Sequence, residues 1–291
     1  MSDQLFLFFQ KILPKRFLTE ILGKLAEIKG GGLTTSFISY FIKRYGVNMS
    51  EAVHAEPSFY QTFNDFFTRE IKSELRPLAK AHLVSPVDGT ISQIGKIQGE
   101  QIFQAKGKSF TSTALLGGDE LLAQHFTNGL FATLYLSPKD YHRIHMPCAG
   151  RLKKMTYIPG DLYSVNPLTA RSIDELFARN ERVVCVFEGE QGPFVMVLVG
   201  ATVVGSVATT WHGSVNSPRP HGVRSWEYDG SLLLEQGAEM GRFLLGSTVV
   251  MLFPHTGSES YQLELSWQPG KEIKMGEAMA TFKNLLSHVF R

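Results

Sequence analysis

The sequence predicts an α+β protein, in which an N-terminal helical region precedes a larger body of antiparallel β-strands. Two observations carry this prediction. Apolar residues recur at helical spacing over residues 1–70, whereas from Ala81 onward short apolar runs alternate with Gly, Pro and Asp turns. We therefore expect a helical region at 1–70 and a β-rich domain, sandwich-like or barrel-like, at 71–291.

The first 45 residues contain three apolar stripes at helical spacing, bordered by lysine and arginine. Pro14 separates the first stripe from the second, and the glycines at 30–32 separate the second from the third. Such helices can lie in a membrane interface, or they can pack as a layer on the protein's own core. The residues alone leave both interpretations open. Segment 58–69 predicts a fourth helix that docks on the core through four phenylalanines: Phe59, Phe63, Phe66 and Phe67.

The β-rich part contains eight short apolar runs bounded by turn residues, and these predict strands. One helix is expected among them, at 171–180. The predicted strands lie at 90–94, 129–136, 150–157, 182–187, 194–199, 202–207, 249–253 and 262–267.

Charge and composition exclude several classes of protein. A formal net charge of +2 over 291 residues is too small to indicate a nucleic-acid partner. The longest apolar stretch, 194–204, is far shorter than the ~20 residues that span a bilayer. The N-terminus lacks a signal-peptide pattern. Cys148 and Cys185 form no disulfide framework and no metal-type spacing, and they fit a reducing compartment.

Three segments contain residues that could carry chemistry. In the first, Asp88-Gly89 precedes a strand, which on its own predicts a turn. In the second, Ser137-Pro138 predicts a helix start, so that His142 and His145 would share one side of a single helical turn at 141–145. No further ligand with metal-site spacing accompanies these histidines, so no metal is expected. The third segment is 246–248, Gly-Ser-Thr, where a tight turn opens a buried strand.

An aspartate, a histidine and a serine are compatible with two chemistries. A hydrolase would use the serine as a nucleophile toward substrate. Ser247 opens a strand, however, and does not lie in a Gly-x-Ser-x-Gly elbow before a helix. Its hydroxyl can instead attack the Gly246 carbonyl, and elimination then leads to a pyruvoyl group, an electron sink for amines. The residues leave both chemistries open, and a non-catalytic membrane-binding β-domain is a third interpretation.

Five motifs resemble the phosphatidylserine decarboxylase family, in its bacterial and mitochondrial membrane-associated branch. The resemblance covers about residues 60–291. The last motif together with the double-histidine motif is highly specific. In chain order the motifs are FNDFFTRE (63–70), SPVDG (85–89), YHRIHMP (141–147), LFARNER (176–182) and GAEMGRFLLGST (237–248).

The resemblance implies that Asp88, His145 and Ser247 form a self-cleavage triad, in which His145 is the general base and Asp88 orients it. Cleavage between Gly246 and Ser247 gives a β chain, 1–246, and an α chain of 291 − 246 = 45 residues that stays associated with it. Ser247 becomes the pyruvoyl cofactor, which forms a Schiff base with the amine of phosphatidylserine. His142 is the implied proton donor after CO2 leaves, and phosphatidylethanolamine is the product.

The same resemblance implies a bacterial homodimer on the cytoplasmic side of the inner membrane, bound to an anionic lipid surface. It favours interfacial N-terminal helices because the substrate lies in the bilayer. The alternative is a pyruvoyl enzyme that decarboxylates a soluble amino acid, for which a Phe-rich amphipathic N-terminus has no use. A lipid hydrolase with the triad Asp88, His145 and Ser247 is a less favoured alternative.

Overall fold

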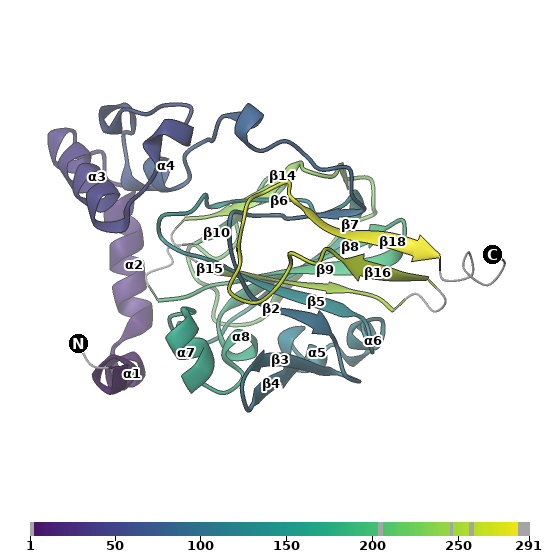
Figure 1. The fold of residues 1–291 in the computed structure, drawn as a ribbon. Helices are drawn as coiled ribbons and strands as arrows, with labels where there is room; N and C mark the ends of the chain where they lie inside the picture. Colours follow the sequence, from purple (N-terminus) through teal and green to yellow (C-terminus); the bar gives the residue numbers. More distant parts are fainter. Residues whose placement is uncertain (1–2, 203–205, 245–246, 256–258, 285–291) are drawn as a thin grey trace.

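The computed structural model describes residues 3–202, 206–244, 247–255 and 259–284, and it has the α+β architecture that the sequence predicts. Helices form the N-terminal part, and antiparallel strands dominate the rest (Figure 1). No helix within these described ranges is long and apolar enough to cross a bilayer.

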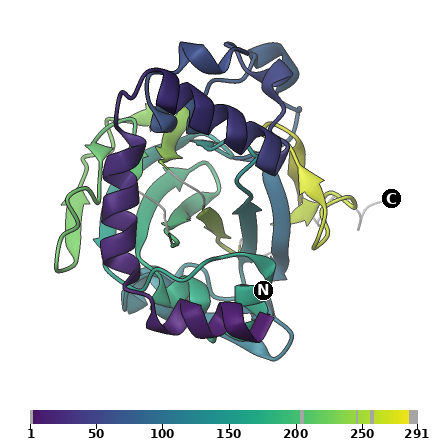
Figure 2. The ribbon, with the colours of Figure 1, turned by 90° about the vertical axis from the view of Figure 1, so that its left-hand side faces the viewer.

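The three N-terminal helices follow the predicted stripes and end at the predicted breaks. Pro14 separates α1 (Asp3–Ile12) from α2 (Lys15–Ala26), and α3 (Gly32–Tyr45) begins after Gly31, whose φ of 55° favours glycine. In Figure 2 these helices border one end of the sheets on three sides. Buried Gln10 joins α1 to the body, because its side-chain oxygen accepts hydrogen bonds from the Ser164 N–H and the Thr202 hydroxyl.

The helix predicted at 58–69 is shorter than expected and consists of α4 (Phe63–Phe67). Thr62 and Asp65 cap its first turn reciprocally, so the helix begins only after Thr62. The three phenylalanines of α4 are buried, as predicted. Phe59, by contrast, ends the 3-10 turn η2 (Pro57–Phe59) and is exposed. Two further 3-10 turns flank this segment, η1 (Met49–Glu51) and η3 (Ser73–Leu75).

A nine-stranded antiparallel sheet forms the centre of the body, and β15 (Ser247–Phe253) runs through its middle. Val249 and Met251 of this strand pack into the core on one face, and Val250 and Leu252 into the core on the other. Burial on both faces explains the unbroken apolar run in the sequence. In spatial order the sheet contains β12 (Arg224–Glu227), β7 (Gly150–Ile158), β8 (Arg182–Gly189), β9 (Gly192–Val199), β15, β5 (Leu130–Leu136), β2 (Gly89–Lys96) and β17 (Glu272–Ile273), with β13 (Leu233–Leu234) paired to β7.

Each face of the large sheet is covered by a different layer, so the sandwich prediction is confirmed. Two smaller sheets cover one face: β11 (Gly213–Ser214), β10 (Val207–Thr209), β14 (Glu239–Phe243) and β6 (Arg143–His145); and β1 (Leu83–Val84), β18 (Ala278–Asn284) and β16 (Glu259–Leu263). A hairpin and short helices cover the other: β3 (Gln101–Ala105), β4 (Lys108–Thr111), α5 (Ser112–Leu115), α6 (Glu120–Gln124), α7 (Pro167–Ser172) and α8 (Leu176–Arg179).

The single helix predicted at 171–180 is wrong, because the chain forms α7 and α8 with a break between them. The side chain of buried Gln104 donates to the carbonyls of Ala170 and Ile173 and accepts from the Leu176 N–H. These bonds satisfy backbone groups that a continuous helix would pair internally, so the interruption leaves none of them unpaired.

Two predicted strands differ from the structure. At 202–207, residues 203–205 lie outside the described residues, Thr202 is in a turn and Val207 begins β10, which pairs with β14 in a smaller sheet. At 262–267, the strand β16 ends at Leu263, because the chain then turns and the Trp267 N–H donates to the Glu264 carbonyl.

Candidate active site at one end of the sandwich

The helical turn predicted at 141–145 is wrong, because Arg143–His145 form the strand β6. The Asp140 carboxylate accepts from the Ser137 N–H and hydroxyl, which closes a tight turn before the strand. Ile144 is fully buried in the core, and β6 pairs with β14. Strand pairing and the burial of Ile144 favour an extended backbone over a helical turn. His142 and His145 therefore do not share one helical side, and each has its own hydrogen-bond partners.

His142 lies under the ring of Phe67, with ring centroids 4.0 Å apart, and has no exposed surface. Its Nδ1 is 2.9 Å from the Asp140 carbonyl oxygen, which can only accept, so Nδ1 carries the proton. Nε2 therefore presents a lone pair, and it is buried without a hydrogen-bond partner. Burial, and then the charge of Arg69, lower the pKa of His142 to about 3, so the imidazole is neutral.

His145 has a partner for each ring nitrogen. Its Nδ1–H donates to the Gly237 carbonyl at 2.8 Å, which fixes the tautomer and leaves the lone pair on Nε2. The Tyr141 hydroxyl lies 3.1 Å from Nε2, and burial raises the pKa of this phenol, so Tyr141 is the donor. Burial also lowers the pKa of His145. The ring is thus a neutral imidazole whose basic nitrogen faces a tyrosine.

The Asp88 carboxylate makes its hydrogen bonds with other groups than His145. It accepts from Arg76 Nε at 2.9 Å and from the Met275 N–H at 2.8 Å, and Lys274 Nζ lies 3.4 Å away. Backbone pairing nevertheless brings the two segments together, because the His145 N–H donates to the Pro86 carbonyl. The charge of Asp88 therefore acts on both histidines through space, and it opposes the lowering of their pKa values.

Ser247 lies at the same end of the sandwich, as the first residue of β15. Its backbone pairs with Leu136, the last residue of β5, and the chain from Leu136 leads into the loop that carries His142. On the far side of β5, Gly89 approaches Tyr135 so closely that a Cβ would lie 2.5 Å from its carbonyl oxygen. The Phe243 N–H donates to the His142 carbonyl. Gly246 lies outside the described residues.

The fold therefore gathers Asp88, the two histidines at 142 and 145, and the backbone of Ser247 from three separate segments of the chain. Sequence reasoning missed the partners of these residues. Tyr141 and Arg69 lie inside conspicuous motifs, and their position there was the only available signal. Arg76 lies outside any motif, and no local pattern points to its pairing with Asp88.

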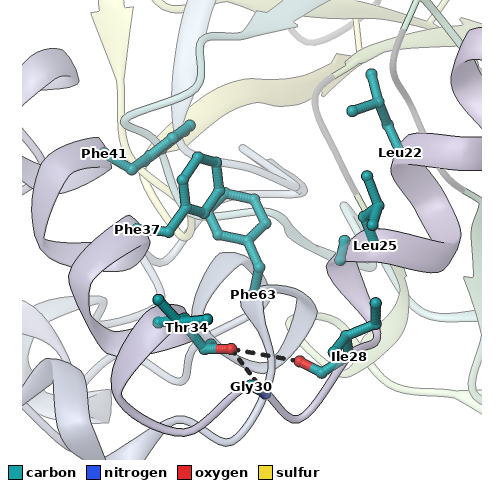
Figure 3. A pocket seen from close by; sticks show the side chains of 10 residues that line it. Leu22, Leu25, Ile28, Gly30, Thr34, Phe37, Phe41 and Phe63 are labelled. Carbon is teal, nitrogen blue, oxygen red and sulfur yellow. Dashed lines mark hydrogen bonds between the residues drawn. The ribbon is translucent and has the colours of Figure 1, made fainter.

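Two pockets adjoin the site. A polar pocket of about 210 Å³ is bounded by Arg69, Asp88, Asp140 and Tyr141, and by Lys139 and Lys274. An apolar pocket of about 490 Å³ lies between α2, α3 and α4, where Phe37, Phe41 and Phe63 lie on one side and Leu22 and Leu25 on the other (Figure 3).

A single phenylalanine connects the apolar pocket to the buried histidine. Phe41 and Phe63 line the pocket and contact Phe67, with ring centroids 6.1 Å and 5.8 Å away. Phe67 in turn covers His142. Two aromatic layers, the lining phenylalanines and then Phe67, therefore lie between the pocket and His142.

Within the described ranges, no group of three or more His, Cys, Asp or Glu side chains is arranged to hold a metal ion. Ser247 is held at the strand end by its pairing with Leu136, and the nearby His142 keeps an open, buried Nε2. A buried polar atom without a partner is uncommon in folded proteins, and a catalytic role is one explanation for it.

Comparisons with known proteins find relatives over nearly the whole chain. A family model described as "Phosphatidylserine decarboxylase" matches residues 63–281, and a second, described as "PSD", matches residues 5–46. A phosphatidylserine decarboxylase proenzyme of Azoarcus sp. (strain BH72) is 61% identical over 280 residues, which cover 96% of this chain and 96% of the relative. Proenzymes of the same name from Delftia acidovorans and Chromobacterium violaceum are 59% and 60% identical, covering 96% and 97% of this chain and 98% and 100% of the relatives.

Proposed function

The chain belongs to the phosphatidylserine decarboxylase family, and from this premise we propose that it converts phosphatidylserine to phosphatidylethanolamine and CO2 at a pyruvoyl group made from its own Ser247. The observation that carries the proposal is the gathering of Ser247, His142 and His145 at one sandwich end, beside an apolar pocket. The alternative of a soluble amino-acid substrate gives no use to that pocket or to the exposed apolar helices around it.

In the proposed self-cleavage, the Ser247 hydroxyl adds to the Gly246 carbonyl and converts the amide to an ester. Loss of the Ser247 Cα proton then expels the ester as the Gly246 carboxylate. The resulting dehydroalanine tautomerises to an imine, and water hydrolyses it with release of ammonia. His145 is our candidate general base, because its tautomer leaves the Nε2 lone pair free to accept a proton. The Tyr141 hydroxyl now donates to that nitrogen, so it must either relay the serine proton or move aside.

The role of Asp88 in this scheme is indirect. Its carboxylate is engaged by Arg76 and the Met275 N–H, so we propose that it favours protonation of His145 through its charge rather than by a hydrogen bond. This arrangement speaks against the hydrolase alternative, because in a Ser-His-Asp triad the histidine is oriented by donating its Nδ1–H directly to the aspartate.

A pyruvoyl group supplies an electrophilic carbonyl that holds the substrate amine and accepts the electron pair left when CO2 departs. His142 is our candidate for returning a proton to the substrate carbon, through Nε2. This nitrogen is unprotonated in the structure, so it must first gain a proton. A bound anionic substrate would favour that step by countering the positive charge of Arg69.

The two cleaved chains are proposed to stay together because residues 247–284 are interwoven with the rest. β15 lies between β5 and β9 in the middle of the large sheet, β17 pairs with β2, and β18 pairs with β1. The hydrogen bond from the Met275 N–H to Asp88 adds a polar contact between the two parts.

The helical layer, which we define as residues 3–45, is proposed to bind the anionic surface of the inner membrane from the cytoplasmic side. Its exposed apolar side chains and the cations beside them, such as Lys43 and Arg44, support this. The homodimer implied by the family resemblance stays a prediction, which sedimentation equilibrium of the detergent-solubilised protein would check.

Ser247→Ala tests the proposed function. The wild-type chain should separate on a denaturing gel into two fragments, and intact mass should assign the smaller one to 45 residues with a pyruvoyl N-terminus (291 − 246 = 45). Ser247→Ala should stay as one band of 32.5 kDa without decarboxylase activity. Ser266→Ala removes an exposed serine from the same fragment and should cleave normally. Two bands from Ser247→Ala, or an unmodified serine at the new N-terminus, would refute the mechanism.

A further inference from the structure

Arg69 is a buried cation that no described carboxylate neutralises. It follows α4, is 4% exposed, and its guanidinium lies over the ring of Phe66 at 5.4 Å. Nη2 donates to the Lys139 carbonyl at 2.9 Å and lies 3.4 Å from the Asp140 carbonyl. Nη1 is buried and has no hydrogen-bond partner. Burial lowers the pKa of Arg69, which reflects a charge held away from water.

Arg69 and His142 meet at one atom. The Asp140 carbonyl oxygen that receives the His142 Nδ1–H also lies within reach of Arg69 Nη2, so the guanidinium and the imidazole are neighbours. Each of the two keeps one buried polar atom without a partner, Nη1 on Arg69 and Nε2 on His142. A buried polar group without a partner destabilises the fold, so two of them on neighbouring side chains need an explanation.

Arg182 shows what a purely structural buried arginine looks like in the same protein. Its Nε, Nη1 and Nη2 donate to the carbonyls of Leu115, Asn180 and Ala114, all within 3.0 Å. Arg182 therefore has a backbone acceptor for each nitrogen. Arg69 uses only one side of its guanidinium in this way and keeps Nη1 available.

The acids near Arg69 are already engaged. In the polar pocket that Arg69 borders, Asp88 is paired with Arg76, the Asp140 carboxylate accepts from Ser137, and Glu272 pairs with Lys139. Ser137 is neutral, so among the described residues around this pocket the Arg69 guanidinium and the Asp140 carboxylate are the two charges without an ion-pair partner. Of these, the guanidinium is the cation, and it lies beside the histidine assigned to protonate the substrate carbon. A guanidinium with a free donor in a desolvated site is suited to an oxyanion.

We propose that Arg69 binds an oxyanion of the phosphoserine head group, with Nη1 as the donor, and thereby holds the substrate against His142. This inference rests on the proposed function and adds a binding residue to it. The same contact has a second effect: an anion on Arg69 offsets the charge that helps to keep His142 neutral, so head-group binding and proton uptake favour each other. The oxyanion belongs either to the phosphodiester or to the carboxylate of the head group.

The test measures binding of two soluble head groups, glycerophosphoserine and glycerophosphoethanolamine, by calorimetry in the Ser247→Ala background, because cleaved enzyme would convert the first ligand to the second. Arg69→Gln should raise the Kd for glycerophosphoserine about 10- to 100-fold, the range for a lost hydrogen bond to a charged group. Arg69→Lys should fall between wild type and Arg69→Gln, because lysine keeps the charge but not the planar fork. Arg224→Gln removes the same charge from an exposed site on edge strand β12 and should leave both Kd values unchanged.

The two ligands identify the oxyanion. An equal loss for both assigns Arg69 to the phosphate, which they share, and a loss confined to glycerophosphoserine assigns it to the carboxylate. Unchanged affinity of Arg69→Gln for both ligands would overturn the proposal. In the Ser247→Ala background with Arg69 intact, the side-chain 15N signal of Arg69 should shift on addition of glycerophosphoserine, and an unmoved signal would overturn it even if the Arg69 variants fail to fold. Failure of the proposed function looks different, because the wild type itself would neither cleave nor release CO2.

Discussion

The helical layer and the sheet body differ in how far their apolar side chains are exposed to solvent. In the body, the side chains of β15 from Val249 to Phe253 have no exposed surface. In the helical layer, Leu33 is 82% exposed and Phe17 is 62% exposed. Among the described residues, twelve large apolar side chains are exposed in the helical layer, against five from Leu83 onward. Apolar side chains exposed in such number are the kind that interaction sites use, which is the basis of the proposed membrane contact, whereas the body buries its apolar side chains internally.

The two regions also differ in what they respond to. The helical layer contains lysines and arginines but no histidine, so salt can modulate its contacts and moderate acid cannot. The body holds His142 and His145, both neutral by burial. Phe67 connects the layer to the site, since it touches Phe41 of the layer and His142. Substitutions in the body should therefore impair self-cleavage or decarboxylation. Substitutions in the helical layer should impair binding to lipid.

The largest effect is expected from His145→Ala in the body. Loss of the general base should slow self-cleavage about 10²- to 10⁴-fold, so the chain should remain as one band and should decarboxylate neither lipid nor short-chain substrate. The measurement is a time course of band intensity after synthesis in a cell-free system. His125→Ala, which removes an exposed histidine after α6, should cleave at the wild-type rate. Rapid cleavage of His145→Ala would assign the base elsewhere.

A second body variant, His142→Gln, should separate cleavage from turnover. Self-cleavage should proceed, because His145 and Ser247 are unchanged, while kcat should fall about 10²- to 10⁴-fold for every form of substrate. CO2 release and the gel are measured on the same preparation. Normal turnover of a cleaved His142→Gln enzyme would contradict its role as proton donor.

In the helical layer, the double variant Phe17→Ser/Leu33→Ser should act on lipid access alone. Burial of each of these side chains in an apolar phase contributes about 1 kcal/mol or more to the free energy of membrane binding. Binding of the double variant to anionic liposomes should therefore weaken about 10- to 100-fold. Sedimentation with liposomes measures this, and turnover of short-chain, water-soluble phosphatidylserine should stay near wild type. Leu121→Ser/Leu265→Ser is the matched control, since both leucines are exposed on the body. Equal loss in both pairs would erase the contrast between the regions.

The smallest effect is an acid sensitivity of the body that its buried histidines create. Folded His142 has a pKa of about 3 against an ordinary value of 6.5, so between these values the unfolded chain binds a proton that the folded chain does not. The free energy of unfolding should therefore fall, as the pH drops below about 6.5, by about 1.4 kcal/mol per pH unit from this residue.

Urea unfolding of Ser247→Ala from pH 7 to pH 4 measures this slope in a single uncleaved chain. The added substitution His142→Gln should make the slope shallower by about the same 1.4 kcal/mol per pH unit. Parallel profiles with and without His142 would show that the imidazole is not held neutral. The helical layer contributes no histidine to either profile.

Local sequence was sufficient for the helices and for the central strand. Apolar spacing, Pro14 and the glycines at 30–32 predicted α1, α2 and α3, and the unbroken apolar run after Ser247 predicted β15. It failed at 141–145, because Ser137-Pro138 carries a local helix signal, whereas pairing with β14 and burial of Ile144 impose an extended chain. It also failed at 171–180, where Gln104, distant in sequence, interrupts the helix.

The sequence by itself determined the fold class, the family resemblance and the residues on which the proposed chemistry depends. The tertiary structure alone decided how those residues are held: the carbonyl of Gly237 sets the tautomer of His145, Arg76 and Met275 occupy Asp88, and Arg69 lies beside His142. The physical reason is that propensity and periodicity are local, whereas each hydrogen-bond partner is selected by which distant segment is buried against it. Met275 lies 187 residues from Asp88, and no local pattern spans that separation.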